Sequence, residues 1–336
     1  SNPDLSEIRR EMEAEYQQAL KLQEEQLRIK FNKQIEDLNN EKEILINAYE
    51  TQLDLQKNES EKAIINIAKG RLRERHEKQE IINKLEKEWK KDENWYKADY
   101  TGYEGLTEYL ISHLLQMSSL DEKEYVLYDT EKLKYKAVEF RGCKSTNFLP
   151  KGWNLITLER LFQNMYGHSL NKSIYTIHSY ENRLEFIVNQ TIRMTGLDDF
   201  GKYMSKLLTI DALFLNEDRH THNIAVLMDD TGEFHYCPFF DHGAGLLADT
   251  MMDYPLTRDL EEAMNEAEAK TFCRSFEEQL EIAEKLYGQQ ITFDFTTKNV
   301  EKLLEKEVYY SEEEKERVKA ILGWQMRKFQ YLFTGR

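Results

Sequence analysis

Residues 5–91 contain no proline and a single glycine, Gly70. These two residue types interrupt helices most strongly, so a stretch that nearly lacks them is strongly biased towards helix. Glu, Lys, Gln, Leu, Ile and Asn dominate it, and apolar residues recur at helical spacing from Ile8 to Leu53. The pattern is longer than one helix of a globular domain, and it predicts a coiled coil or a long helical hairpin over residues 1–92.

The heptad pattern of this extension is imperfect, because Gln34, Lys42 and Gln52 fall near seam positions. A mostly solvated single helix is therefore the alternative to a coiled coil. Gly70 and the basic sequence RLRERH at 71–76 mark the expected break in the helix. We expect the extension to mediate homo-oligomerisation or to bind a partner protein.

Aromatic residues become frequent from Asn94 onward, which marks the change to a globular part. A small strand-containing region is expected over residues 93–152, with a strand at 94–100, a helix at 103–117, and strands at 124–129 and 135–140 joined by a turn at 130–134. A mainly helical region follows over residues 153–336, with helices near 156–166, 181–194, 198–214, 258–288 and 311–333. Two strand-like pieces, 223–229 and 233–239, flank a turn at 230–232, so the predicted fold class is α+β.

The net charge, the cysteine spacing and the length of the apolar runs argue against several classes of protein. The formal net charge of −16 opposes binding to nucleic acid and to anionic membranes. Cys143, Cys237 and Cys273 are odd in number and lack CxxC spacing, which argues against a disulfide framework or a zinc site. The apolar runs are far shorter than the roughly 18 residues that a membrane-spanning helix needs. We therefore expect a cytoplasmic protein with no transmembrane segment and no direct nucleic-acid partner.

Polar residues crowd around the predicted hairpin. Asp218 and Asn223 lie in NEDRHTHNIAVL at 216–227, just before the first strand, and Asp241 follows the second strand in FFDHGAGLL at 239–247. Phosphoryl transfer requires a carboxylate that orients the attacking hydroxyl, and oxygen ligands for Mg²⁺. The pattern predicts a phosphoryl-transfer site in which Asp218 is the catalytic base, and Asn223 and Asp241 are metal ligands.

Two other interpretations of these residues stay open. The loop could be only a polar turn in which Asp218 pairs with Arg219 or caps a helix. His220, His222 and His242 could instead form the metal site of a hydrolase, although no HxxxH or HExxH spacing supports this. Next to Asp218, His220 is expected to brace the loop by hydrogen bonding, and we group it with Asp218 as a candidate catalytic residue.

LNEDRHTHNIAVL at 215–227 followed by FFDHGAGLL resembles the catalytic domain of the HipA-like serine/threonine kinases, and the DRHxxN form also occurs in phosphatidylinositol kinases. The similarity extends to WYKADYTGYEGLTEYLISHLL at 95–115, to CKSTNFLP at 143–150 and, more loosely, to AKTFCRSFEEQLE at 269–281. It covers roughly residues 94 to 333. It implies a protein-kinase-like bilobal fold, with a small strand-containing lobe and a large helical lobe, and the use of ATP and Mg²⁺.

The resemblance also implies roles for single residues. Asp218 matches the catalytic-loop aspartate, Asn223 the metal-binding asparagine, and Asp241 the aspartate of the DFG-like motif, here Asp-His-Gly. Lys97 is the candidate for the lysine that holds the α- and β-phosphates. Its carboxylate partner on the following helix is either Glu104 or Glu108. The nucleotide hinge falls near 145–148, so further candidate nucleotide-binding residues are Ser145, Asn147 and Phe148.

The sequence departs from the family pattern before Lys97. A kinase small lobe normally begins with two strands and a phosphate-covering loop, whereas here only Gly70 precedes Lys97 and residues 71–91 look helical. Either AKGRLRE at 68–74 supplies the covering loop, or the small lobe is truncated.

The expected activity is transfer of the γ-phosphoryl group of ATP to a protein serine or threonine hydroxyl. A lipid or small-molecule hydroxyl is the enzymatic alternative. The alternative from another class is a pseudokinase scaffold whose coiled coil binds partners. The segment after Asp241 occupies the place of an activation segment, with Thr250 and Thr257 as candidate phosphorylation sites.

Overall fold

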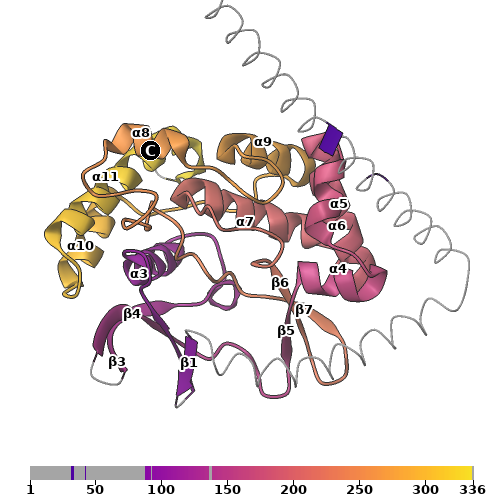
Figure 1. Ribbon diagram of the computed structural model, residues 1–336, viewed down its shortest axis with the longest axis horizontal. Coiled ribbons are helices and arrows are strands. Elements are labelled where there is room, and N and C mark those ends of the chain that lie inside the picture. The colour runs from indigo at the N-terminus through magenta and orange to yellow at the C-terminus, as the bar shows by residue number, and fades with distance from the viewer. Residues whose placement is uncertain (1–31, 34–41, 43–87, 92, 136–137, 335–336) are drawn as a thin grey trace, which may run out of the picture. The chain divides into compact units, whose positions relative to one another are not determined.

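The computed structural model describes residues 32–33, 42, 88–91, 93–135 and 138–334 (Figure 1). The chain divides into two units, Ser1–Asn58 and Glu59–Arg336. In the first unit the described residues are Asn32, Lys33 and Lys42, all helical. The rest of the predicted coiled coil up to residue 87, the break at Gly70 and the candidate covering loop at 68–74 lie outside the described residues. All other described residues belong to the second unit.

An antiparallel four-stranded sheet opens the described part of this unit. Its strands are β1 (Glu88–Lys91), β2 (Asn94–Ala98), β3 (Tyr128–Tyr135) and β4 (Val138–Thr146), in the order β1-β2-β4-β3. The sequence predicts helix up to residue 91, and for residues 88–91 this prediction is wrong. Their backbone pairs with β2 from Glu88 opposite Lys97 to Lys91 opposite Asn94. Tertiary pairing overrides helix propensity here.

Of the strand expected at 124–129, only the last two residues belong to β3, which begins at Tyr128 and continues to Tyr135, so the predicted turn at 130–134 is wrong. Leu133 is buried, whereas its neighbours Lys132 and Lys134 are exposed. This period of two is the signature of a strand with one covered face. Lys132 and Lys134 occupy the solvent face of the strand.

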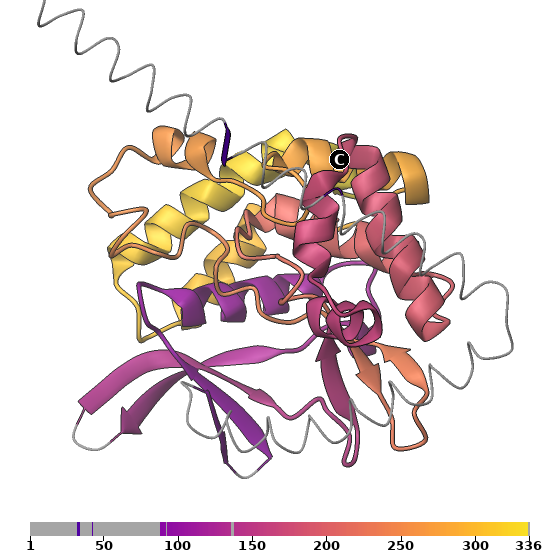
Figure 2. The ribbon, with the colours of Figure 1, turned by 45° about the vertical axis from the view of Figure 1, so that its right-hand side comes forward.

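The helix α3 (Glu104–Leu115) lies between this sheet and the helical part of the unit (Figure 2). The predicted apolar face of Leu106, Leu110 and Leu114 has no exposed surface. Its polar residues Thr107, Glu108 and Ser112 are equally buried, so the helix is covered on every side. A carboxylate on such a helix must find a partner inside the protein.

The second part of the unit is mainly helical and carries a small antiparallel sheet in the order β5-β6-β7. The strands are β5 (Asn154–Thr157), β6 (Ala225–Met228) and β7 (Phe234–Tyr236). The helices are α4 (Leu158–Tyr166), α5 (Leu170–Thr176), α6 (Tyr180–Thr195), α7 (Phe200–Phe214), α8 (Leu260–Glu266), α9 (Phe276–Tyr287), α10 (Thr297–Lys306) and α11 (Glu312–Lys328). Short 3₁₀ turns lie at Glu122–Glu124 and Gln330–Leu332.

Most predicted helices of this part are confirmed within a few residues, while the segment 258–288 is two helices rather than one. Ser275 caps the second of them by accepting a hydrogen bond from the Glu278 backbone N–H. α7 is the central helix and contacts α6, α9 and α11. Between α7 and the β6-β7 hairpin runs the loop that carries Asp218 (Figure 1). None of the described helices is long and apolar enough to span a membrane.

Candidate functional site

Lys97, near the end of β2, contacts two carboxylates from distant parts of the chain. Its Nζ lies 3.4 Å from Oε1 of Glu108 on α3 and 2.5 Å from Oδ1 of Asp241, which follows β7. Glu108 is fully buried, whereas the side chains of Lys97 and Asp241 are each 31% exposed. The structure therefore joins β2, α3 and the segment after β7 through one ammonium group.

Of the two candidate carboxylates on α3, the structure pairs Glu108 with Lys97. The second oxygen of Glu108, Oε2, accepts a hydrogen bond of 2.9 Å from the backbone N–H of His242. Glu104 lies one turn earlier and is used locally: its carboxylate accepts hydrogen bonds from the backbone N–H groups of Thr101 and Gly102. The inclusion of Glu104 as a partner of Lys97 is therefore wrong, because its oxygens hold the loop that precedes α3.

The charge states at this site follow from the close packing. The positive charge of Lys97 lowers the pKa of Asp241 to about 2, against the effect of burial. Burial by itself lowers the pKa of Lys97, but the charges of Asp241 and Glu108 outweigh it and raise that pKa well above its ordinary value. Complete burial raises the pKa of Glu108. At neutral pH the exposed end of this cluster is an ionised Asp241 carboxylate beside an ammonium ion.

The backbone around Asp241 is unusual. Asp241 has a φ of 60°, in the left-handed region that residues with a side chain seldom adopt. This turn aims the Asp241 carboxylate at Lys97 and the next backbone N–H, that of His242, at Glu108. Gly243 passes so close that an added Cβ would lie 3.2 Å from Glu108 Oε1 and 3.5 Å from Lys97 Nζ. The Asp-His-Gly sequence thus fits against the ion pair.

Asp218 and Asn223 are in direct contact on the loop before β6. Asn223 Nδ2 donates to the backbone oxygen of Asp218 at 2.7 Å and to its Oδ2 at 3.0 Å. The Asp218 side chain is 51% exposed, and its Oδ1 lies 3.3 Å from His220 Nε2. This contact raises the pKa of His220. The loop therefore presents a carboxylate to solvent while an amide and an imidazole orient it.

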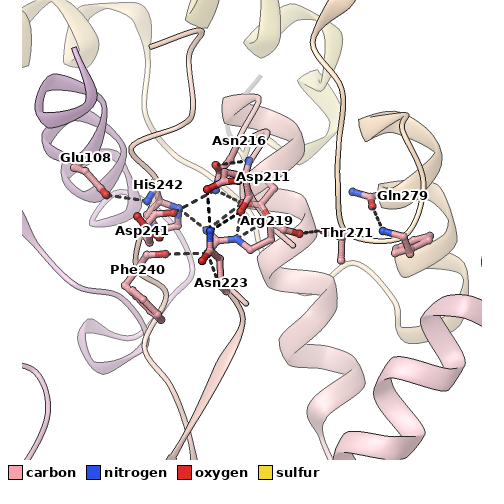
Figure 3. Close-up of polar contacts among 12 residues, drawn as sticks. Glu108, Asp211, Asn216, Arg219, Asn223, Phe240, Asp241, His242, Thr271 and Gln279 are labelled. Atoms are coloured by element: carbon pink, nitrogen blue, oxygen red, sulfur yellow. Dashed lines mark hydrogen bonds and ion pairs between the residues drawn. The ribbon is translucent and has the colours of Figure 1, made fainter. Parts of the chain in front are cut away.

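Arg219 anchors this loop through buried polar contacts (Figure 3). Its guanidinium is 2% exposed and forms an ion pair with Asp211 on α7, whose carboxylate is 1% exposed. Nη1 donates to the carbonyl oxygens of Asn223, at 2.9 Å, and Phe240, at 3.1 Å. Nη2 donates to Asp211 and to Nδ1 of His242. All five N–H groups of the guanidinium thus have acceptors. The idea that Arg219 pairs with Asp218 is wrong.

Because Phe240 and His242 flank Asp241, Arg219 couples the Asp218 loop to the Asp241 segment. His242 has no exposed surface, and burial together with the charge of Arg219 lowers its pKa well below the ordinary value. It is thus a neutral acceptor of the Arg219 hydrogen bond. Asn216 completes the network by donating to Asp211 at 2.9 Å.

The three-histidine metal site has no geometric support. His242 is buried against Arg219, whereas His220 and His222 pack ring to ring with centroids 5.4 Å apart. Across the part of the chain that the structure describes, no group of three or more His, Cys, Asp and Glu side chains could hold a metal ion.

Two further contacts fix the Asp218 loop. Thr221 Oγ1 donates to Glu159 of α4 at 2.8 Å, and both side chains are buried. Glu217 Oε1 accepts hydrogen bonds of 2.9 Å from Tyr254 Oη and from the Glu268 backbone N–H. The segment between Asp241 and α9, which carries Thr250 and Thr257, is therefore tied to the loop on both sides of α8.

The three candidate nucleotide-binding residues of the predicted hinge have different surroundings. Ser145 is buried within β4, opposite Trp95 and Tyr128. The Asn147 side chain serves its own connection, since it accepts from Trp95 Nε1 and donates to the Leu149 carbonyl. The Phe148 ring lies 5.7 Å from that of Phe240, the neighbour of Asp241. Of the three, Phe148 contacts the segment that carries the charged site.

The sequence reasoning missed the buried supports of the site, above all Asp211, Arg219 and Glu159. A usable signal was present for Arg219, because an arginine in a short loop between a buried helix and a buried strand needs a buried acceptor. Asp211 is the carboxylate in the apolar stretch that ends α7. A charged residue in each of two buried segments therefore already suggests an ion pair between Asp211 and Arg219.

No protein-family model matches the sequence, and no curated protein matches it. Among solved structures, the fold is similar to that of a proinflammatory kinase, CtkA, from Helicobacter pylori. The TM-score is 0.48 with 16% sequence identity, over 70% of this chain and 86% of that one.

Proposed function

We propose that this chain is an ATP- and Mg²⁺-dependent kinase of the HipA-like type that phosphorylates protein serine or threonine hydroxyls. The observation that supports this best is the single network that joins Lys97, Glu108 and Asp241 to the Asp218 loop through Arg219. This network holds the Lys97 ammonium group, the carboxylates of Asp218 and Asp241 and the Asn223 amide at fixed relative positions, and phosphoryl transfer requires such groups.

The exposed residues of the network fit a magnesium nucleotide by their chemistry. Mg²⁺ takes one or two carboxylates and completes its shell with water and phosphate oxygens, so it does not need a cage of three protein ligands. Asp241 would supply a carboxylate and Asn223 its amide oxygen, because the nitrogen of that amide is used by Asp218. Lys97 would hold the α- and β-phosphates. When bound, Mg²⁺ neutralises phosphate charge during transfer.

Asp218 has the position of a group that acts on the acceptor hydroxyl. It is the most exposed carboxylate of the network, and it is oriented by Asn223 Nδ2 and His220 Nε2. We infer that Asp218 orients this hydroxyl and accepts its proton. His220 then acts as a positioning residue, and Arg219 keeps the loop in register with Asp241.

A protein acceptor is favoured by the family resemblance of the loop sequences. The three cysteines are buried, odd in number and without CxxC spacing, which fits a reducing compartment such as the cytoplasm. The N-terminal extension is proposed to bind a partner protein or a second copy of the chain.

The test is incubation of the full chain with γ-labelled ATP and Mg²⁺ and a dephosphorylated protein mixture. Parallel reactions contain lipid vesicles or small-molecule alcohols as acceptors. We expect wild type and the matched control Asp198→Asn, at an exposed aspartate, to transfer label, and Asp218→Asn and Asp241→Asn to lose transfer by about a hundredfold or more. Equal transfer by wild type and Asp218→Asn would contradict the proposal.

If wild type transfers no label to any acceptor, thermal stability with MgATP decides between the remaining cases. Stabilisation that Lys97→Met abolishes would indicate a nucleotide-binding scaffold. No stabilisation would reject a nucleotide site.

A further inference from the structure

Four side chains connect the C-terminal helices to the start of α3, outside the site described above. Asp99 follows β2, Arg141 lies on β4, Tyr310 precedes α11, and Glu314 is in its first turn. We call these four residues the C-terminal brace. Tyr310 Oη donates to Asp99 Oδ2 at 2.8 Å, and the guanidinium of Arg141 lies 4.5 Å from the centre of the Tyr310 ring.

Asp99 caps the N-terminus of α3 although it lies outside the helix, before the N-cap residue Tyr103. Asp99 Oδ1 accepts a hydrogen bond of 2.7 Å from the Gly105 backbone N–H, one of the groups in the first turn that no helical carbonyl can satisfy. The negative charge also lies at the favourable end of the helix dipole. Asp99 is two residues from Lys97, and Gly105 is three residues from Glu108 on α3. One carboxylate therefore sets the first turn of the helix that carries Glu108 against the strand that carries Lys97.

Arg141 supplies the link to α11. Its two terminal nitrogens bind the two oxygens of Glu314 at 2.8 and 3.0 Å, and Nη2 also donates to the Gly102 carbonyl at 3.2 Å. Glu314 is 8% exposed and Arg141 is 36% exposed. A bidentate pair of this kind fixes direction as well as distance. It holds α11 to β4 and to the loop that enters α3.

The packing leaves no room for α3 to shift towards the sheet at this point. An added Cβ at Gly105 would lie 2.5 Å from the Gly142 carbonyl carbon and 2.5 Å from Tyr310 Oη. One turn beyond Gly105 and next to Glu108, Tyr109 Oη donates to the Leu303 carbonyl of α10 at 3.1 Å. The C-terminal helices thus contact α3 at its first turn and again in its middle.

We propose that Asp99, Arg141, Tyr310 and Glu314 are positioning residues that hold α3 where Glu108 reaches Lys97, so that the C-terminal helices set the competence of the phosphate site. The part of this inference that concerns phosphate rests on the proposed kinase function. The mechanical part, that the brace fixes the first turns of α3, stands on the contacts alone.

The test uses the full chain with Tyr310→Phe, which removes only the hydroxyl that donates to Asp99. Tyr309→Phe is the matched control, because it makes the same change at the neighbouring, partly exposed tyrosine. A second pair is Glu314→Gln against the exposed Glu313→Gln. Hydrogen exchange of the α3 amides measures the brace directly, and the Kd for MgATP measures its effect on the site.

We expect both brace variants to exchange the α3 amides about tenfold faster than wild type, equivalent to about 1.4 kcal/mol, with α7 amides and the controls unchanged. The Kd for MgATP should rise about tenfold in the same two variants. A uniform rise of exchange over α3 and α7 would mean a merely structural role and would overturn the proposal.

The two hypotheses fail in different ways. If wild type binds no MgATP, the proposed function is wrong, and the α3 exchange still decides whether the brace exists. If wild type binds MgATP and the brace variants match their controls in both measurements, the brace is wrong and the proposed function is untouched.

Discussion

Replacement of Arg219 by methionine is the sharpest perturbation that the network offers. The change keeps a long side chain and removes the guanidinium from a site where it is 2% exposed. It leaves the Asp211 carboxylate buried without its counter-ion, and it leaves the carbonyl oxygens of Asn223 and Phe240 without their donor. His242 loses its donor as well.

The size of the effect follows from these contacts. Removal of one partner of a buried ion pair costs about 3–5 kcal/mol, because the remaining charge is uncompensated. Each buried carbonyl left without a donor adds on the order of 1 kcal/mol, although rearrangement or entry of water relieves part of this. We therefore expect Arg219→Met to lower the free energy of unfolding by about 4 kcal/mol at pH 7.5.

Urea unfolding followed by tryptophan fluorescence measures this change, with Lys202→Met as the control. Lys202 pairs with Asp199 at the surface, where the side chains are 57% and 67% exposed, so this loss should stay below about 1 kcal/mol. The double variant Arg219→Met with Asp211→Leu removes both charges together. It should be more stable than the sum of the single losses implies, by about 2 kcal/mol or more.

Acid should partly rescue Arg219→Met. Burial already raises the pKa of Asp211, and loss of Arg219 removes the charge that opposes this rise. A carboxyl whose pKa is higher in the folded than in the unfolded protein stabilises the fold below the unfolded pKa, and this stabilisation is lost as the pH rises through the folded pKa. The deficit of the variant should therefore be smaller at pH 5 than at pH 8. A single-variant loss below about 1 kcal/mol, or strict additivity in the double variant, would refute the reasoning.

Three further predictions concern the region around α3 and α11. Burial raises the pKa of Asp99 to about 6. The contribution of Asp99 to the free energy of unfolding should therefore fall by up to about 3 kcal/mol as the pH rises from 4 to 7. Urea titrations at the two pH values should show that Asp99→Asn loses this pH dependence. Glu108→Gln should weaken MgATP binding about tenfold with little loss of thermal stability, because a fully buried carboxylate becomes a neutral amide; a clear fall in melting temperature would contradict this. Gly323→Ala should raise the free energy of unfolding by about 0.5–1 kcal/mol, since Gly323 is inside α11 and its nearest obstacle is the Arg327 side chain at 3.7 Å; a loss in urea unfolding would show that the site is tighter than its backbone indicates.

The elements with a clear period could be read from the sequence. The helix expected at 198–214 is α7, and the hairpin expected around 230–232 is β6-β7. The failures have one physical cause, which is that long-range contacts decided the outcome. Residues 88–91 are a strand because β2 is available to pair with them. Lys132 and Lys134 belong to β3 because β4 pairs beside them.

At the candidate site, contacts between residues close in sequence could be predicted from their spacing. Contacts between segments far apart in sequence could not. Asp218 and Asn223 are close in sequence, and their contact follows from the loop itself. The choice between Glu104 and Glu108 required the direction of each side chain, since both lie on nearly one face of α3. The orientation of α3 relative to β2 depends on Asp99 and the C-terminal helices, which lie far away in sequence.

The crowding of polar and charged residues at 216–223 is explained by the burial of some members of the loop and the exposure of others. Asn216, Arg219 and Thr221 are buried and bind Asp211 and Glu159, whereas Asp218 and His222 are exposed. If this loop moved in either direction, at least one buried donor or acceptor would lose its hydrogen-bond partner. The buried members therefore restrict where the exposed ones can be. Substitutions of the buried residues should therefore lower the free energy of unfolding, whereas substitutions of the exposed Asp218 should act mainly on the proposed phosphoryl transfer.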